Sequence, residues 1–137
     1  MRTYALFKKE KGLERYLTDI KNISVRTKVT KFRLSNHKLM IEVGRHQGIE
    51  DEKQRFCPFC PQDVENESHF LFSCPVYTFQ RNTLLDPITR TYPNFSNLPT
   101  SLKLEFVMSY MDQNVCNYIA NASDIREFLV SKPKRVN

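Results

Sequence analysis

Apolar residues recur at helical spacing over much of this 137-residue chain. The clearest stretch lies between residues 25 and 45, where one narrow helical stripe contains Val25, Val29, Phe32, Leu39 and Val43. A stripe of this kind predicts a helix that packs one face on a core and leaves the other in water. The pattern fits one helix that runs to Arg45, and it fits equally two helices divided at Ser35-Asn36-His37.

Weaker helical patterns lie on both sides of this stretch. One runs through residues 3–20, with an interruption at Gly12, and contains Leu6, Leu13, Leu17 and Ile20. Helices are also predicted at residues 68–72, 76–85, 102–110 and 115–130. The helix at 76–85 is predicted from Val76, Phe79 and Leu84. Residues 86–100 contain three prolines and predict a loop, and no segment shows the strong alternation of a strand.

Three cysteines and a histidine in the middle of the chain have the spacing C-x2-C-x8-H-x4-C. They are Cys57, Cys60, His69 and Cys74. The first two lie in a predicted tight turn that aims both sulfurs at one point. His69 and Cys74 then close a tetrahedron from a second, short helical segment. Thiolates and a neutral imidazole are the ligands that zinc prefers, and four protein ligands leave no open position for a substrate water. The motif therefore predicts structural rather than catalytic Zn²⁺.

The run Cys57-Pro58-Phe59-Cys60 also resembles a glutaredoxin-type redox motif. That chemistry requires the first cysteine at a helix N-terminus after a buried strand. Here a charged run precedes the motif, and Pro61 with an acidic turn follows it. Metalloprotease, nucleotide-binding and serine-hydrolase motifs are absent from the sequence as well, so we expect no enzymatic activity.

The other reactive side chains have ordinary explanations. Cys116 lies in an apolar helical pattern and is expected to be a buried core thiol. His37 and His46 are expected to be polar surface or capping residues. The acids of the metal loop are expected to be solvated and to keep the loop exposed: Asp63, Glu65 and Glu67.

Composition disfavours some fold classes and indicates the cellular compartment. Three glycines and no tryptophan disfavour a β-barrel or a Gly-rich nucleotide fold. No stretch approaches the roughly 18 apolar residues of a membrane helix, and the N-terminal residues lack the apolar region of a signal peptide. We therefore expect an intracellular, reducing location in the nucleus or cytoplasm and no membrane partner. In such a compartment clustered cysteines bind metal rather than form disulfides.

Positive charge is concentrated before the cysteine motif. Residues 1–55 contain fourteen Lys or Arg and seven acids, whereas residues 56–137 contain seven and eight. On the predicted helix Lys31, Lys38 and Arg45 form a row at seven-residue spacing, flanked by Lys28. Several cations on a rigid helix suit the phosphates of a nucleic acid, while an ordinary solvated helix face is the alternative.

Together these patterns predict a mainly α fold, a small helical domain organised around a structural CCHC zinc site. It is expected to form one compact domain of four segments. These are a basic helical segment at 1–55, a zinc-binding segment at 56–85, a Pro-rich loop at 86–100 and C-terminal helices at 101–137.

Several runs of residues also resemble a known family. They are Thr30–His37 with Leu39, Ile41-Glu42 and Gly44-Arg45, then Cys57–Cys60, Glu67–Leu71 and Cys74–Tyr77. In order and spacing, over residues 27–85, they resemble the zinc-binding region that follows the polymerase domain of non-LTR (LINE-type) retrotransposon reverse transcriptases. The flanking residues match that region more loosely.

The resemblance implies zinc at the four Cys and His residues and contacts to template RNA or target DNA from the basic segment. With Lys28 and Arg55 added to the matching cations, the candidate nucleic-acid-binding set is Lys28, Lys31, Arg33, Lys38, Arg45 and Arg55. The chain departs from the family because it lacks the polymerase and its paired catalytic aspartates. We expect a piece of a longer polyprotein or a small protein derived from such an element, and not a polymerase.

Two functions fit these expectations. The first is a non-enzymatic, zinc-stabilised module that grips the RNA or DNA backbone, with selectivity from nucleic-acid shape. The second is a zinc-stapled helical domain that binds a protein partner through the C-terminal helices at 102–130. The two functions differ in what they predict for the aromatic residues of these helices, which are Phe106, Tyr110, Tyr118 and Phe128. If these side chains form an exposed apolar patch, a protein partner is favoured, and if they are buried, nucleic-acid binding is favoured.

Overall fold

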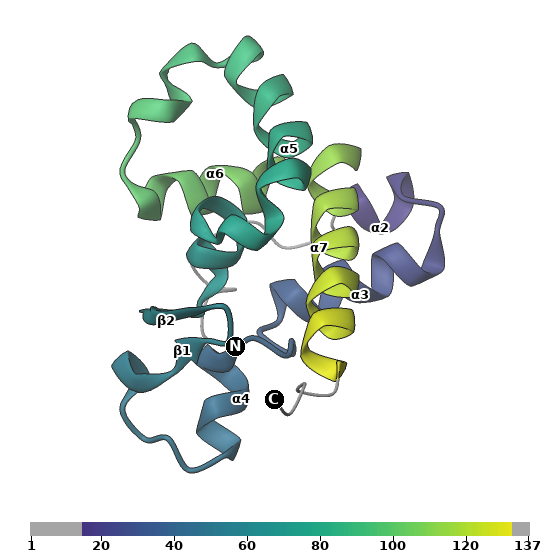
Figure 1. Cartoon of the computed structure of the whole chain (residues 1–137). Coiled ribbons are helices and arrows are strands. Elements are labelled where there is room, and N and C mark those ends of the chain that lie inside the picture. Colours follow the sequence, from purple (N-terminus) through teal and green to yellow (C-terminus); the bar gives the residue numbers. More distant parts are fainter. Residues whose placement is uncertain (1–14, 133–137) are drawn as a thin grey trace.

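The structure, a computed structural model, describes residues 15–132 and is mainly α-helical (Figure 1). Its helices and strands are α2 (Arg15–Asp19), α3 (Ile23–Arg33), α4 (Met40–His46), η1 (Glu52–Gln54), β1 (Phe56–Cys57), β2 (Cys60–Val64), η2 (His69–Ser73), η3 (Pro75–Tyr77), α5 (Thr78–Thr91), η4 (Pro93–Asn97), α6 (Thr100–Tyr110) and α7 (Gln113–Ser131). The predicted fold class is therefore confirmed. Residues 3–14 of the predicted first helix lie outside the described residues.

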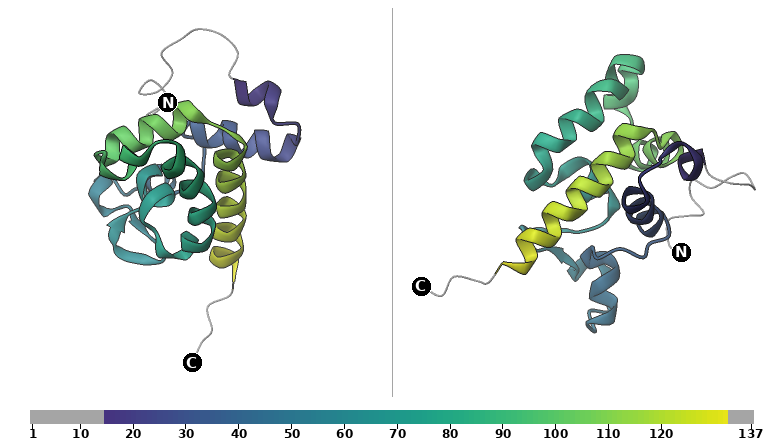
Figure 2. Two further views of the ribbon diagram at one scale, coloured as in Figure 1. Left: turned by 90° about the horizontal axis from the view of Figure 1, so that it is seen from above. Right: turned by 90° about the vertical axis from the view of Figure 1, so that its right-hand side faces the viewer.

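Helix α7 is the centre of the fold. It lies between α3 and α5 and packs against both (Figures 1 and 2). Its buried residues recur at helical spacing and face the apolar residues of those two helices in one core cluster. The cluster includes Val115, Ile119 and Ala122 from α7, Val29 and Phe32 from α3, and Leu84 and Ile88 from α5. Cys116 is fully buried in the same cluster, as predicted.

The apolar stripe at 25–45 forms two helices, which is the second of the two arrangements that the sequence allows. Helix α3 begins after Asn22, whose side chain accepts a hydrogen bond from the Val25 N–H at 3.2 Å. It ends at Arg33, and Ser35 then adopts a left-handed backbone with a φ of 57°. A non-glycine residue in that region does not continue a right-handed helix, so the chain turns before α4 begins at Met40.

The predicted loop at 86–100 is partly wrong. Helix α5 continues through Pro87 to Thr91, and only the remainder is a short 3₁₀ segment with its connections. Proline inside a helix removes one hydrogen bond and costs about 3 kcal/mol. Here Leu84 and Ile88, four residues apart on one face, are both buried against the core, and this packing offsets the cost.

Candidate metal centre

The four predicted metal ligands come from two pieces of chain, the β1–β2 hairpin and the turn that precedes η3 and α5 (Figure 1). Strands β1 and β2 form a tight antiparallel hairpin in which Cys57 is paired with Cys60. His69 begins the single π-helical turn η2, and Cys74 directly follows that turn. The ligand atoms of all four residues lie within 4.8 Å of one another. The structure thus brings together the four residues as a site that can hold a metal ion.

Hydrogen bonds at both ends fix the turn that carries His69 and Cys74. At its start the Asn66 side chain accepts from the His69 N–H at 2.9 Å. At its end the Cys74 N–H donates to the His69 carbonyl at 2.8 Å. Arg81 of α5 donates to the carbonyl oxygens of Leu71, at 3.0 Å, and Cys74, at 2.6 Å. These contacts hold the imidazole and the thiol on the same side of the turn.

The distances fit a tetrahedral ion. The Cys74 sulfur lies 4.0 Å from that of Cys57 and 3.9 Å from that of Cys60. Four ligands at the zinc–sulfur bond length lie about 3.8 Å apart in a regular tetrahedron. In addition, the Nε2 atom of His69 is buried and has no hydrogen-bond partner among the described residues. A buried nitrogen without a partner is costly, and a metal ion at this position would satisfy it.

Burial controls the protonation of the ligands. It raises the pKa of the Cys57 thiol to about 12, although the Phe59 N–H, 3.5 Å from that sulfur, favours the thiolate. Burial also raises the pKa of Cys74 and lowers that of His69. In the absence of a cation these groups are therefore neutral near pH 7. A divalent cation reverses the preference of the thiols because it binds the thiolate directly.

Glu65 was expected to be a solvated acid, and this expectation is wrong. Its side chain is 2 % exposed and accepts two hydrogen bonds from Arg126 of α7, at 2.8 and 2.9 Å. It also accepts from the Met40 N–H at 2.7 Å, and one of its oxygens lies 3.9 Å from the Cys57 sulfur. The carboxylate thus joins the metal hairpin to α4 and α7. Sequence reasoning missed Arg126 because 61 residues separate it from its partner.

Glu67 is also buried rather than solvated, and it pairs with His37. The His37 Nε2 and the Glu67 Oε1 lie 3.0 Å apart. The other ring nitrogen of His37 accepts from the Leu39 N–H at 3.3 Å. His37, expected to be a polar surface or capping residue, is therefore a largely buried side chain held by two hydrogen bonds. Glu67 lies just before the turn that carries His69, and His37 lies between α3 and α4. Their pairing therefore fixes the connection between these two helices to the metal centre.

Two of the six candidate nucleic-acid-binding residues lie in the interior. The Arg33 guanidinium is buried, donates to the Met108 carbonyl and lies over the Tyr16 ring. Arg55 is buried and donates to three backbone carbonyls, including that of Ile41 at 2.8 Å. Both guanidinium groups donate to buried backbone carbonyl oxygens inside the fold, so neither is available to a phosphate.

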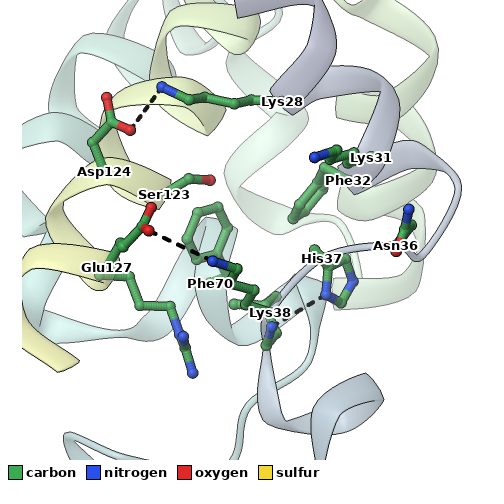
Figure 3. Close-up of a pocket in the computed structure, with 12 residues that line it drawn as sticks. Lys28, Lys31, Phe32, Asn36, His37, Lys38, Phe70, Ser123, Asp124 and Glu127 are labelled. Atoms are coloured by element: carbon green, nitrogen blue, oxygen red, sulfur yellow. Dashed lines mark hydrogen bonds and ion pairs between the residues drawn. The ribbon is translucent and has the colours of Figure 1, made fainter. Parts of the chain in front are cut away.

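Three of the remaining cations surround one hollow between α3 and α7. Lys28, Lys31 and Lys38 line this space of about 320 Å³, above a floor that includes the buried rings of Phe32 and Phe70 (Figure 3). We call it the lysine hollow. Arg45 lies outside it, on α4, where it is 61 % exposed and pairs with Glu42 at 2.8 Å.

Acids of α7 face the lysine hollow. Lys28 reaches Asp124 at 2.7 Å and Lys38 reaches Glu127 at 3.5 Å (Figure 3). No ion pair or hydrogen bond joins the Lys31 side chain to another residue within 15–132. Of the three lysines that line the hollow, Lys31 is therefore uncommitted and the other two are held by exposed ion pairs. Arg126, which also lines the hollow, is bound to Glu65.

Comparison with known proteins adds no relative. No family model matches the chain, and neither a curated protein nor a solved structure matches it. Within the described part of the chain, no helix combines the length and the apolar character needed to cross a membrane.

Proposed function

We propose that the metal centre binds one Zn²⁺ ion and that the ion has a structural role. Three thiols and one imidazole form the donor set that zinc prefers. The sulfur separations near 4 Å and the unpartnered Nε2 of His69 support a closed tetrahedral site. With four protein ligands no position is left for a reacting water, so we propose no enzymatic activity.

We further propose that this zinc-stabilised domain binds the backbone of RNA or DNA through the lysine hollow. The observation that carries the proposal is the convergence of Lys28, Lys31 and Lys38, from two different segments, on one space. Cations held on a rigid support favour the closely spaced phosphates of a nucleic acid. The ion pairs to Asp124 and Glu127 are exposed and contribute only about 0.2–1 kcal/mol, so phosphates can replace these carboxylates.

The metal centre supports the lysine hollow directly. His37 and Lys38 lie on the connection between α3 and α4, which is tied to the metal segment by the His37–Glu67 pair. Two residues later the Met40 N–H is bound by Glu65, next to Cys57. Zinc binding would therefore fix the position of Lys38 relative to Lys28 and Lys31, and this is the structural role that we propose for the ion.

The resemblance to the post-polymerase zinc region of non-LTR retrotransposon reverse transcriptases supports the same proposal. It spans the metal ligands and the segment that carries Lys31 and Lys38. On this proposal the protein works in the nucleus or cytoplasm. It is either part of a larger element-encoded protein or a small protein derived from one.

The direct test is a fluorescence-anisotropy titration of the zinc-loaded protein with labelled RNA and DNA, in single-stranded and duplex form, repeated over a range of salt concentrations. Binding whose log K falls linearly with log salt would support contacts to phosphates, and the slope would give their number. Absence of binding to every nucleic acid at low salt would overturn the proposal.

A second candidate function, binding of a protein partner, is favoured by an aromatic cluster at α6. Tyr92 and Tyr110 are 45 % and 41 % exposed, and Phe106 lies between them with ring centroids 5.2 and 5.6 Å away. Tyr118, in contrast, is buried, and Phe128 is 61 % exposed at the far end of α7. A Tyr92→Ser/Tyr110→Ser variant that loses a partner while it retains nucleic-acid binding would support this function.

A further inference from the structure

A second groove lies between α5 and α7. It encloses about 450 Å³ and is lined mainly by uncharged polar side chains. The lining includes Phe79 and Gln80 from α5 and Asn114, Asn117, Asn121 and Asp124 from α7. We call this space the amide groove. Its residues belong neither to the metal centre nor to the lysine hollow, except Asp124, which borders both spaces.

Phe79 gives the amide groove an open aromatic surface. The sequence places this residue on the apolar pattern of residues 76–85, yet its side chain is 81 % exposed. Leu84 and Ile88 rather than Phe79 face the core. An aromatic ring this exposed at the edge of a groove offers a face on which another flat group can stack.

The amides around Phe79 have unused hydrogen-bonding capacity. Within the described residues no hydrogen bond is made by the side chains of Gln80, Asn114 or Asn121, whereas Asn117 accepts from Gln113 at 2.8 Å. Each primary amide presents two donors and one acceptor. This combination matches the polar edge of a nucleobase, which also alternates donors and acceptors.

The amide groove adjoins the lysine hollow. Asn121 and Asp124 are three residues apart on α7 and therefore lie on the same side of that helix. Asp124 is bound by Lys28, at 2.7 Å, on the side of the lysine hollow. The first cation of the hollow thus lies about one helical turn from the amides.

We propose that the amide groove binds one unstacked base of a single-stranded nucleic acid, whose phosphates lie in the lysine hollow. This inference rests on the proposed function and adds a strand preference to it. Phe79 stacks on the face of the base, and Gln80, Asn114 and Asn121 bind its edge. A base in a duplex has neither its face nor its pairing edge free, so the groove selects single strands, loops and bulges.

A nucleobase fits this groove better than a protein side chain does. The groove offers one ring face together with a set of amides, and a base has a flat face bordered by a polar edge. The adjoining cations also require a ligand that carries negative charge next to the bound group. A base attached to its own phosphates meets both requirements at once.

The test compares binding of labelled single-stranded RNA, single-stranded DNA and duplexes by the wild-type protein and by Phe79→Ala. We expect Phe79→Ala to weaken single-strand binding about tenfold, to leave duplex binding unchanged and to keep the salt slope of the wild type. Phe79→Trp should restore binding because it restores a stacking face. The matched control is Phe128→Ala, which removes another exposed phenylalanine outside the groove and should have no effect.

The outcomes separate this inference from the proposed function. If Phe79→Ala keeps full affinity for single strands while removal of the three lysines abolishes it, the amide-groove inference is overturned and the backbone-binding proposal stands. If Phe79→Ala weakens duplex binding equally, the groove does not read a base and the inference is again overturned. A wild-type protein that binds no nucleic acid overturns both.

Photo-crosslinking provides a second measurement that does not depend on a variant. The wild-type protein is irradiated with a single-stranded oligonucleotide that contains 4-thiouridine, and crosslinked peptides are identified by mass spectrometry. We expect a crosslink within the α5 segment around Phe79 and Gln80. Crosslinks confined to other segments would overturn the inference even if the affinity of Phe79→Ala had changed.

Discussion

Arg126 of α7 donates two hydrogen bonds to the carboxylate of Glu65, which stands 3.9 Å from the sulfur of Cys57. The arginine is 9 % exposed and the glutamate 2 %. Burial alone would lower the pKa of Arg126, but hydrogen bonding to Glu65 raises it above its usual value. The guanidinium therefore stays ionised inside the protein, and the pair connects the central helix to the metal hairpin. Contacts around metal ligands of this kind orient the ligands themselves.

Removal of one partner of this pair should be strongly destabilising. We expect Arg126→Ala to lower the free energy of unfolding by about 3–5 kcal/mol, because it leaves the Glu65 carboxylate buried without its counter-ion. Chemical denaturation of the zinc-loaded protein measures the change. Lys38→Ala is the control, since its ion pair with Glu127 is exposed on both sides and should contribute at most about 1 kcal/mol. Equal losses for the two variants would contradict a structural role for the buried pair.

The metal itself should be required for the fold around the hairpin. We expect Cys57→Ser to lose bound zinc and helical content, because the energy of metal binding is also folding energy in a site of this type. Elemental analysis and circular dichroism measure the two effects. Cys116→Ser is the matched control, since it changes a buried thiol that lies outside the four-residue cluster. That variant should bind one zinc per chain, and loss of zinc from it would contradict the assignment of the ligands.

Zinc binding should release at least two protons near pH 7. Burial raises the pKa of Cys57 to about 12 and also raises that of Cys74, so both thiols are protonated before the ion binds. Burial lowers the pKa of His69 below 6.5, so the imidazole is already neutral and contributes no proton. Affinity should therefore rise with pH and fall on acidification as protons compete for the thiolates. Calorimetry in buffers of different ionisation enthalpy counts the protons, and a count below two would contradict this protonation scheme.

The metal ligands could be predicted from sequence because their chemistry and spacing are local. Cys57 and Cys60 belong to one hairpin, and His69 and Cys74 to one turn, so little depends on distant residues. The partners of Glu65 could not be predicted in this way. Its hydrogen bonds reach Met40 and Arg126, 25 and 61 residues away, and only the packing of α7 on the hairpin brings them together.

Charge alone was a poor guide to which cations face water. A lysine and an arginine contribute equally to the basic row, but a planar guanidinium can satisfy several buried carbonyls at once. Arg33 and Arg55 are used in that way, whereas Lys28, Lys31 and Lys38 remain at the surface.

The end of α5 was also not predicted. The proline-rich composition of residues 86–100 indicated a loop, but the helix continues because the apolar spacing of Leu84 and Ile88 outweighs Pro87.

The contrast between buried arginines and surface lysines gives a prediction for Arg33 of α3. Arg33→Ala should lower the free energy of unfolding by about 2 kcal/mol, because it removes a charged donor and leaves the Met108 carbonyl without this partner. The salt dependence of nucleic-acid binding should not change, since Arg33 does not reach the surface. Denaturation and anisotropy titration on the same sample distinguish the two effects. A flatter salt slope with unchanged stability would place Arg33 at the nucleic-acid interface after all.

The three lysines of the hollow should show the opposite behaviour. In Lys28→Ala/Lys31→Ala/Lys38→Ala we expect weaker binding to all sequences and a salt slope reduced by about 2 for a single strand, because each lost phosphate contact lowers it by about 0.7. Stability should change by at most about 2 kcal/mol, because each of the two exposed ion pairs removed contributes at most about 1 kcal/mol.

The control for this variant removes equal charge elsewhere. Lys21→Ala/Lys53→Ala/Arg90→Ala replaces three exposed cations that do not line the hollow. If binding depended only on net charge, the two triple variants would lose affinity equally. A larger loss and a flatter slope for the hollow variant would assign the contacts to that space, where Lys28, Lys31 and Lys38 converge. Equal losses would contradict the lysine hollow as the binding site while leaving nucleic-acid binding itself intact.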